Sequence, residues 1–169
     1  KFLDKNGYWL PITYRARLIV YHKDRVNENE LSTYSSLIDP KWKGKILVRS
    51  SKNAYNQALL SSMIANLGET KALNWSNKIV ENFSREPKGN DRDQVRAIAA
   101  GVGDIAIVNS YYIGLLKSSV DSNDRVVGET VNVFFPNQST SGTHINISGM
   151  GLLRNSPNTE IFMWVPEVD

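Results

Sequence analysis

One stretch of the chain, residues 103–114, constrains the fold more than any other. It reads Gly-Asp-Ile-Ala-Ile-Val-Asn-Ser-Tyr-Tyr-Ile-Gly and follows a Gly-Val turn signal. The β-branched run 104–108 predicts a short buried strand. Ser110 is a favourable helix N-cap, so residues 111–117 are expected to form a helix. The stretch therefore predicts a strand that passes directly into a helix, with two adjacent tyrosines at the junction.

Strand-like and helix-like segments alternate along the rest of the chain. Strands are predicted at 15–21, 45–49, 104–108, 131–135 and 143–148. Helices are predicted at 34–38, 70–83, 92–100 and 111–117, and a further helix is predicted to start at cap residues in 50–53 and to end at 67. A polar loop is predicted at 118–124. This alternation is typical of an α/β fold with a mainly parallel sheet flanked by helices. Ligands of such sheets bind beyond the carboxyl ends of the strands, where helix N-termini favour anions.

The composition excludes several classes of protein. A chain of 169 residues, 41% of them hydrophobic, suits one domain with a real core, and its apolar runs are too short for a membrane span. The net charge is +3, and the 20 Lys and Arg residues are dispersed among 17 acidic ones without forming a basic stripe. We therefore expect neither nucleic-acid binding nor membrane insertion. With no cysteine and only His22 and His144, any metal site must rely on oxygen ligands, which select hard cations.

Three tyrosines supply such ligands. Tyr55, Tyr111 and Tyr112 each follow a predicted strand, so we expect them to converge at one edge of the sheet. A phenol in water ionises at about pH 10, but a highly charged cation favours its anionic form. Ferric iron gains most from this, whereas calcium would need a carboxylate loop that the sequence lacks. Arg15 and Arg17, on one face of a strand, could hold a small anion beside the metal.

Other interpretations of the same residues stay open at this point. One tyrosine of the pair could pack in the core while the other lies on the surface, or the tyrosines could stack on an organic ligand. A tyrosine could also serve an enzyme as general acid. The sequence contains no nucleophile elbow, Walker A loop or zinc-protease motif, and helix capping and solvation account for Asp91 and Asp93. We therefore expect a binding protein and no enzyme.

Further motifs carry a family resemblance. The string at 89–101 is Gly-Asn-Asp-Arg-Asp-Gln-Val-Arg-Ala-Ile-Ala-Ala-Gly, and it precedes the strand with the tyrosine pair. Supporting motifs are Tyr-Arg-Ala-Arg at 14–17, Asp-Pro-Lys-Trp-Lys-Gly-Lys at 39–45, Phe-Pro-Asn-Gln at 135–138 and Gly-Thr-His-Ile-Asn-Ile-Ser-Gly at 142–149. In this order they cover about residues 13–151, and the chain resembles the periplasmic ferric-ion-binding proteins of bacterial ABC iron importers.

The resemblance implies a type II periplasmic-binding-protein fold, in which two α/β lobes joined by hinge strands close on Fe³⁺. It also implies that Tyr111 and Tyr112 are the paired iron ligands and that Tyr55 is a third. An arginine, Arg15 in preference to Arg17, is expected to contact a synergistic anion such as carbonate.

The family's members are longer than this chain, which sets the expected domain organisation. Residues 1–151 are expected to form the second lobe, with hinge strands near 14–21 and 144–149, and residues 152–169 an unassigned C-terminal tail. The first lobe of the same protein is expected but absent from this chain. The implied function is the periplasmic component that binds ferric iron and delivers it to an ABC transporter permease. The alternative is a periplasmic lobe for another small anion or organic solute, on which the tyrosines stack.

Overall fold

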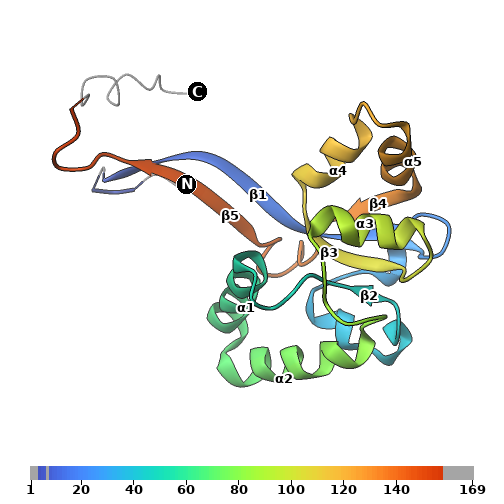
Figure 1. Cartoon of the computed structure of the whole chain (residues 1–169). Helices are drawn as coiled ribbons and strands as arrows, with labels where there is room; N and C mark the ends of the chain where they lie inside the picture. Colours follow the sequence, from blue (N-terminus) through green and yellow to red (C-terminus); the bar gives the residue numbers. More distant parts are fainter. Residues whose placement is uncertain (1–3, 7, 158–169) are drawn as a thin grey trace. The chain divides into compact units, whose positions relative to one another are not determined.

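The computed structural model describes residues 4–6 and 8–157 of the chain (Figure 1). Contacts between residues divide it into two units. The first, here called the sheet unit, comprises residues 15–146 and holds most of the secondary structure. The second, here called the ribbon unit, comprises the residues up to Tyr14 and those from Ile147 onward. All five residues considered for the functional site lie in the sheet unit.

The sheet is built around a long strand that runs opposite to both of its neighbours. This long strand is β1 (Trp9–His22). The strand order in the sheet is β2-β3-β1-β4, with β2 at Ile46–Leu47, β3 at Ile105–Asn109 and β4 at Val131–Phe134. Strand β1 pairs antiparallel with both β3 and β4, whereas β2 and β3 pair in parallel. The prediction of a mainly parallel sheet is therefore wrong. Alternation of strands and helices does not reveal the direction of a strand that no helical crossover joins to its neighbour.

Within the described residues, five α-helices pack around this sheet (Figure 1). They are α1 (Ala54–Leu67), α2 (Glu69–Ile79), α3 (Asp91–Ala99), α4 (Tyr111–Lys117) and α5 (Ser122–Thr130), accompanied by the 3₁₀ turns η1 (Glu28–Glu30), η2 (Ser35–Ile38), η3 (Pro40–Trp42) and η4 (Val80–Asn82). Helix α1 begins and ends where its caps predict, because the Asn53 side chain accepts the Tyr55 N–H and Gly68 has a φ of 85°. Helix α5 was not predicted: it begins inside the predicted polar loop 118–124 and continues to Thr130, and the Asp121 side chain caps it by accepting the Asn123 N–H.

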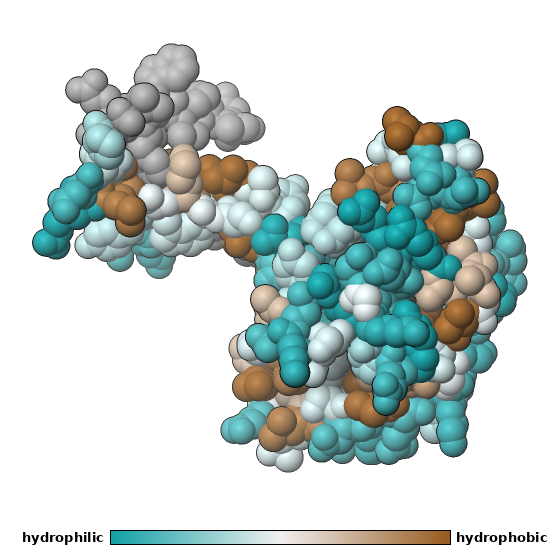
Figure 2. All heavy atoms as spheres, in the orientation of Figure 1, coloured by the Kyte–Doolittle hydropathy of each residue, from teal (hydrophilic) through white to brown (hydrophobic). Residues whose placement is uncertain are grey.

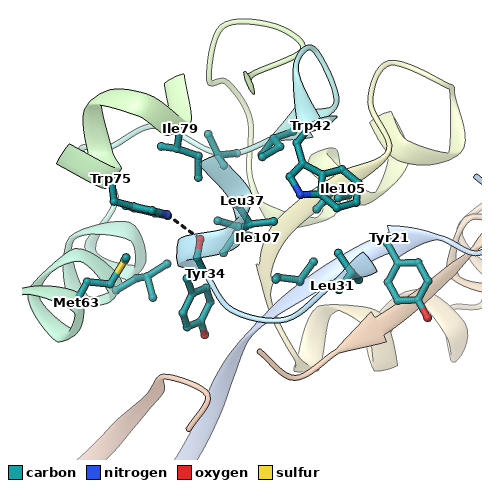
Figure 3. Packing of buried hydrophobic residues seen from close by; sticks show 14 of the residues in the cluster. Tyr21, Leu31, Tyr34, Leu37, Trp42, Met63, Trp75, Ile79, Ile105 and Ile107 are labelled. Carbon is teal, nitrogen blue, oxygen red and sulfur yellow. Dashed lines mark hydrogen bonds between the residues drawn. The ribbon is translucent and has the colours of Figure 1, made fainter. Parts of the chain in front are cut away.

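The core lies on both faces of the sheet, as the two alternating sets of residues in β1 require. Ile19 and Tyr21 pack in a cluster with the η2, α1 and α2 side chains, whereas Leu18 and Val20 pack in a second cluster with α3 and α4. Figure 3 shows the first cluster, where the Trp75 indole N–H donates to the Tyr34 carbonyl oxygen at 2.7 Å. Helices thus cover both faces, which confirms that part of the prediction.

Some apolar side chains of α1, of α2 and of the turn η4 lie at the surface. They are Ile64 and Leu67 of α1, Leu73 of α2 and Val80 of η4. Figure 2 shows separate apolar patches on a mainly hydrophilic face. Among the described residues, no helix combines the length and apolar character that a bilayer span requires.

The ribbon unit contains the first part of β1 and most of β5 (Ile145–Gly151), which pair with each other. Gly149 lies so close to the ring of Trp9 that an added Cβ would approach Trp9 Cε3 to 2.6 Å. A glycine is therefore needed at that position. Of the predicted C-terminal tail, residues 152–157 form turns and irregular structure, and residues 158–169 lie outside the described part of the chain.

Candidate metal centre

The tyrosine pair lies where the opening stretch of sequence predicts it. Strand β3 is buried along its whole length, and α4 begins immediately after Ser110. Tyr111 and Tyr112 occupy the first turn of that helix, with ring centroids 4.1 Å apart and ring planes tilted by 34°. Tyr111 is 39% exposed, so part of this residue reaches solvent. The Ser110 side chain makes no cap hydrogen bond and instead accepts the Ala16 N–H at 3.3 Å.

The third predicted tyrosine joins the other two. Tyr55 lies in the first turn of α1, a position that the Asn53 cap holds. Burial raises the pKa of Tyr111, and hydrogen bonding to the phenols of Tyr112 and Tyr55 raises it further. Tyr111 therefore lies within interaction range of both other tyrosines, although Tyr55 is separated from the pair by more than fifty residues of sequence. In the absence of a cation, Tyr111 retains its proton at neutral pH.

Three guanidinium groups surround the Tyr55 ring. Their Cζ atoms lie 5.5 Å (Arg15), 5.9 Å (Arg17) and 5.6 Å (Arg49) from the ring centroid. At this range an arginine is attracted to the face of an aromatic ring. The same positive charges favour a nearby anion, whether a phenolate or a small bound ion. Both predicted arginines are thus near Tyr55, and Arg49 is a third that the sequence did not predict. Its position at the end of the predicted strand 45–49, just before the Tyr55 helix, is the signal that could have identified it.

The two predicted arginines differ in how they are engaged. Arg17 is fully buried, and its Nη1 donates to Asp91 at 2.6 Å. Arg15 is half-buried, and the Nε atoms of both arginines are buried without a hydrogen-bond partner within the described structure. The two Nη atoms of Arg17 donate to Asp91, Asn109 and Asn56, so that guanidinium is held by protein groups. The side-chain hydrogen bonds of the described residues include none from Arg15, which leaves its donors for an anion.

Asp91 has a role that the sequence analysis did not predict. Asn90, and not Asp91, caps α3, since the Asn90 side chain accepts the N–H groups of Arg92 and Asp93. Asp91 itself is fully buried and pairs with Arg17, with Arg49 3.4 Å from its other carboxylate oxygen. Capping and solvation thus do not explain Asp91, because a buried carboxylate requires a charged partner.

The histidines and the acidic residues do not form a competing metal site. Within residues 4–6 and 8–157, no group of three or more His, Asp or Glu side chains is arranged to hold a metal ion. His22 accepts the Asp24 N–H at 3.2 Å through Nδ1. Burial lowers the pKa of His144, and Arg17 lowers it further. Oxygen ligands for a hard cation in the sheet unit are therefore best sought among the tyrosines.

A separate apolar pocket of about 410 Å³ lies between α1 and α2. Leu59, Leu60, Trp75 and Ile79 line it, and Arg49 lies at its edge. None of the three predicted tyrosines lines this pocket. An organic solute bound in it would not stack on them.

Comparison with known sequences identifies the relatives of this chain. Residues 1–158 match the family described as bacterial extracellular solute-binding protein. Iron uptake protein A1 of Synechocystis sp. is 47% identical over 155 residues, which are 92% of this chain and 43% of that protein. Iron uptake protein A2 of the same organism is 52% identical over 157 residues, 92% of this chain and 45% of that protein. The chain spans about half the length of these relatives.

Solved structures with the same fold include proteins whose descriptions name iron. A Trichodesmium protein (IdiA, FutA) in complex with iron and citrate superimposes with a TM-score of 0.89 at 48% identity, over 93% of this chain and 50% of that one. A ferric binding protein from Campylobacter jejuni gives a TM-score of 0.86 at 42% identity, over 93% of this chain and 50% of that one. These likenesses confirm the predicted type II periplasmic-binding-protein fold.

Proposed function

Since the chain belongs to the bacterial extracellular solute-binding protein family, we propose that it is the tyrosine-bearing lobe of a protein that binds ferric iron. Tyr55, Tyr111 and Tyr112 serve as phenolate ligands in this proposal. The observation that carries it is the contact of the Tyr111 and Tyr112 rings, whose centroids lie 4.1 Å apart, with Tyr55 close enough to raise the pKa of Tyr111. Three hard anionic donors close to one another would suit a small trivalent cation. The iron uptake proteins among the relatives support the same conclusion.

The proposed role is transport without chemical conversion. The complete protein would capture ferric iron in the periplasm and deliver it to the permease of an ABC importer. Residues 1–151 would form the second lobe, with hinge strands near 14–21 and 144–149. The boundaries between the sheet and ribbon units, after Tyr14 and after Asn146, fall inside both segments and support this assignment.

We further propose that Arg15 contacts a synergistic anion beside the metal. Its guanidinium lies against Tyr55 and keeps donors unused by other described residues. Carbonate is the expected anion. Citrate is a second candidate, because it accompanies iron in the Trichodesmium relative. Arg15→Gln should weaken ferric binding mainly in the presence of that anion, whereas an effect equal with and without bicarbonate or citrate would contradict this assignment.

Visible absorption tests the metal site directly. Ferric nitrilotriacetate added to the chain should produce a tyrosinate-to-iron charge-transfer band that the reagent alone lacks. The double variant Tyr111→Phe/Tyr112→Phe should lose the band, and the control Tyr8→Phe, at an exposed tyrosine of the ribbon unit, should keep it. Absence of the band in the unsubstituted chain, or its persistence in the double variant, would contradict the proposal. An organic ligand that stacks on the rings would instead bind the Phe variants as well.

A further inference from the structure

We infer that Asp91 is a positioning residue that holds the Tyr55 helix and the tyrosine-pair helix in place relative to each other. The inference rests on the proposed function, because it concerns the same three phenols. The hydrogen bonds of Asp91 go to Arg17, Arg49 and the Asn109 backbone, so its effect on the phenols passes through those groups. These contacts and those of Asn56 are here called the Asp91 network.

One arm of the Asp91 network reaches the tyrosine pair. Asp91 Oδ2 accepts the backbone N–H of Asn109 at 2.8 Å. The Asn109 side chain in turn accepts from Arg17 Nη1 at 3.3 Å. Asn109 is the last residue of β3, and only Ser110 separates it from Tyr111. The carboxylate therefore fixes the point from which α4 starts.

The other arm reaches the Tyr55 helix. Arg17 Nη2 donates to the Asn56 side-chain oxygen at 2.6 Å. Asn56 Nδ2 donates to the carbonyl oxygens of Arg49 at 2.8 Å and Ser50 at 3.3 Å. Asn56 directly follows Tyr55, so this arm fixes the first turn of α1 and the segment that leads into it. Arg17 bridges the two arms with separate guanidinium nitrogens.

Burial makes this arrangement specific. Arg17, Asp91 and Asn109 are all fully buried, so water cannot replace a lost partner. The planar guanidinium binds its acceptors only in fixed directions, and each acceptor belongs to a different element of the fold. A metal site requires its ligands to be held by surrounding hydrogen bonds, and loss of such support typically lowers metal affinity about 10- to 100-fold.

Asp91→Asn tests the inference in this chain, with ferric nitrilotriacetate as the probe. The substitution keeps the shape of the side chain and removes its charge. We expect ferric affinity to fall about 10- to 100-fold, with a shifted or weakened visible band. Asp104→Asn is the matched control. Asp104 forms an ion pair of the same 2.6 Å length with Arg25, and it precedes β3 at the end opposite Asn109. The control should bind iron as the unsubstituted chain does.

Hydrogen exchange of the metal-free chain provides a readout independent of iron. Asp91→Asn should accelerate amide exchange in residues 53–58 and 109–114 more than in the rest of the sheet unit. If the unsubstituted chain binds no iron, the proposed function fails, and this measurement still decides the positioning role. Unchanged exchange in both segments, or acceleration spread evenly over the sheet unit, would overturn the inference.

Asn56 supplies a second variant in case Asp91→Asn does not fold. Asn56→Ala removes the acceptor for Arg17 without leaving a buried charge unpaired. Asn66→Ala, at an exposed asparagine later in the same helix, is its control. We expect Asn56→Ala to lower ferric affinity and accelerate exchange in both segments, and Asn66→Ala to leave both as in the unsubstituted chain. Equal behaviour of the two variants would overturn the inference.

Discussion

Arg17 of the central strand and Asp91 of α3 form an ion pair at 2.6 Å, with neither side chain exposed to solvent. Burial lowers the pKa of Arg17, and the coulombic attraction and hydrogen bond of Asp91 oppose that shift. The pair joins residues 74 positions apart, and its Arg17 guanidinium lies 5.9 Å from the centroid of the Tyr55 ring. Removal of either charge alone would leave the other buried without a partner, and the free energy of unfolding of the sheet unit should fall strongly.

Arg17→Met should destabilise the chain by about 3–5 kcal/mol, because it leaves the Asp91 carboxylate buried without its main partner. Urea unfolding followed by circular dichroism measures the change in the free energy of unfolding. Arg96→Met is the control, since the Arg96–Asp124 pair has a 44% exposed arginine and should contribute about 1 kcal/mol or less. A similar small loss in both variants would show that the buried pair is not essential to stability.

Two glycines, Gly103 before β3 and Gly114 in α4, should respond oppositely to alanine. A Cβ at Gly103 would lie 2.8 Å from the Lys45 carbonyl oxygen, so Gly103→Ala should destabilise by about 1–3 kcal/mol. A Cβ at Gly114 in α4 would have no neighbour within 4 Å, so Gly114→Ala should stabilise by about 0.5–1 kcal/mol. Thermal unfolding of both variants checks the signs. Destabilisation by Gly114→Ala would contradict the prediction.

The two histidines should make stability depend on pH. Burial lowers the pKa of His22 and of His144 below the ordinary value of 6.5. Between the folded pKa values and 6.5, the unfolded chain binds more protons, so the free energy of unfolding falls as the pH drops through this window. Above 6.5 this contribution is fully retained. Urea unfolding should be measured at several pH values, from pH 7 down to the pKa values of the folded chain. The free energy of unfolding should fall less steeply with decreasing pH in the double variant His22→Gln/His144→Gln than in the unsubstituted chain. An unchanged slope would contradict the prediction.

Ferric binding should release protons, because each phenol must ionise to become a ligand. The raised pKa of Tyr111 means that this tyrosine enters the reaction protonated at neutral pH. Apparent affinity should therefore rise with pH. Calorimetry in two buffers of different ionisation enthalpy counts the protons released on addition of ferric nitrilotriacetate. Tyr55→Phe should release one proton fewer per bound metal ion, and an unchanged count would remove Tyr55 from the ligand set.

Local sequence predicts the elements that carry the site better than the way they assemble. Asn53 and Gly68 bound α1 as expected, because caps act within a turn of the helix. Helix α5 was missed because its sequence is polar and only Gly128 is buried. Two of the missed site residues, Arg49 and Asn56, look like ordinary polar residues until Arg17 and Tyr55 are placed beside them.

The sequence by itself determined that tyrosines follow a buried strand and start two helices, since β-branched runs, caps and turn glycines act over a few neighbouring residues. Only the tertiary structure decided that β1 runs antiparallel to β3, that Arg17 meets Asp91, and that Tyr55 reaches the tyrosine pair. Those contacts join segments far apart in the chain. They depend on which distant surfaces pack together, a choice governed by the total burial of apolar and charged groups.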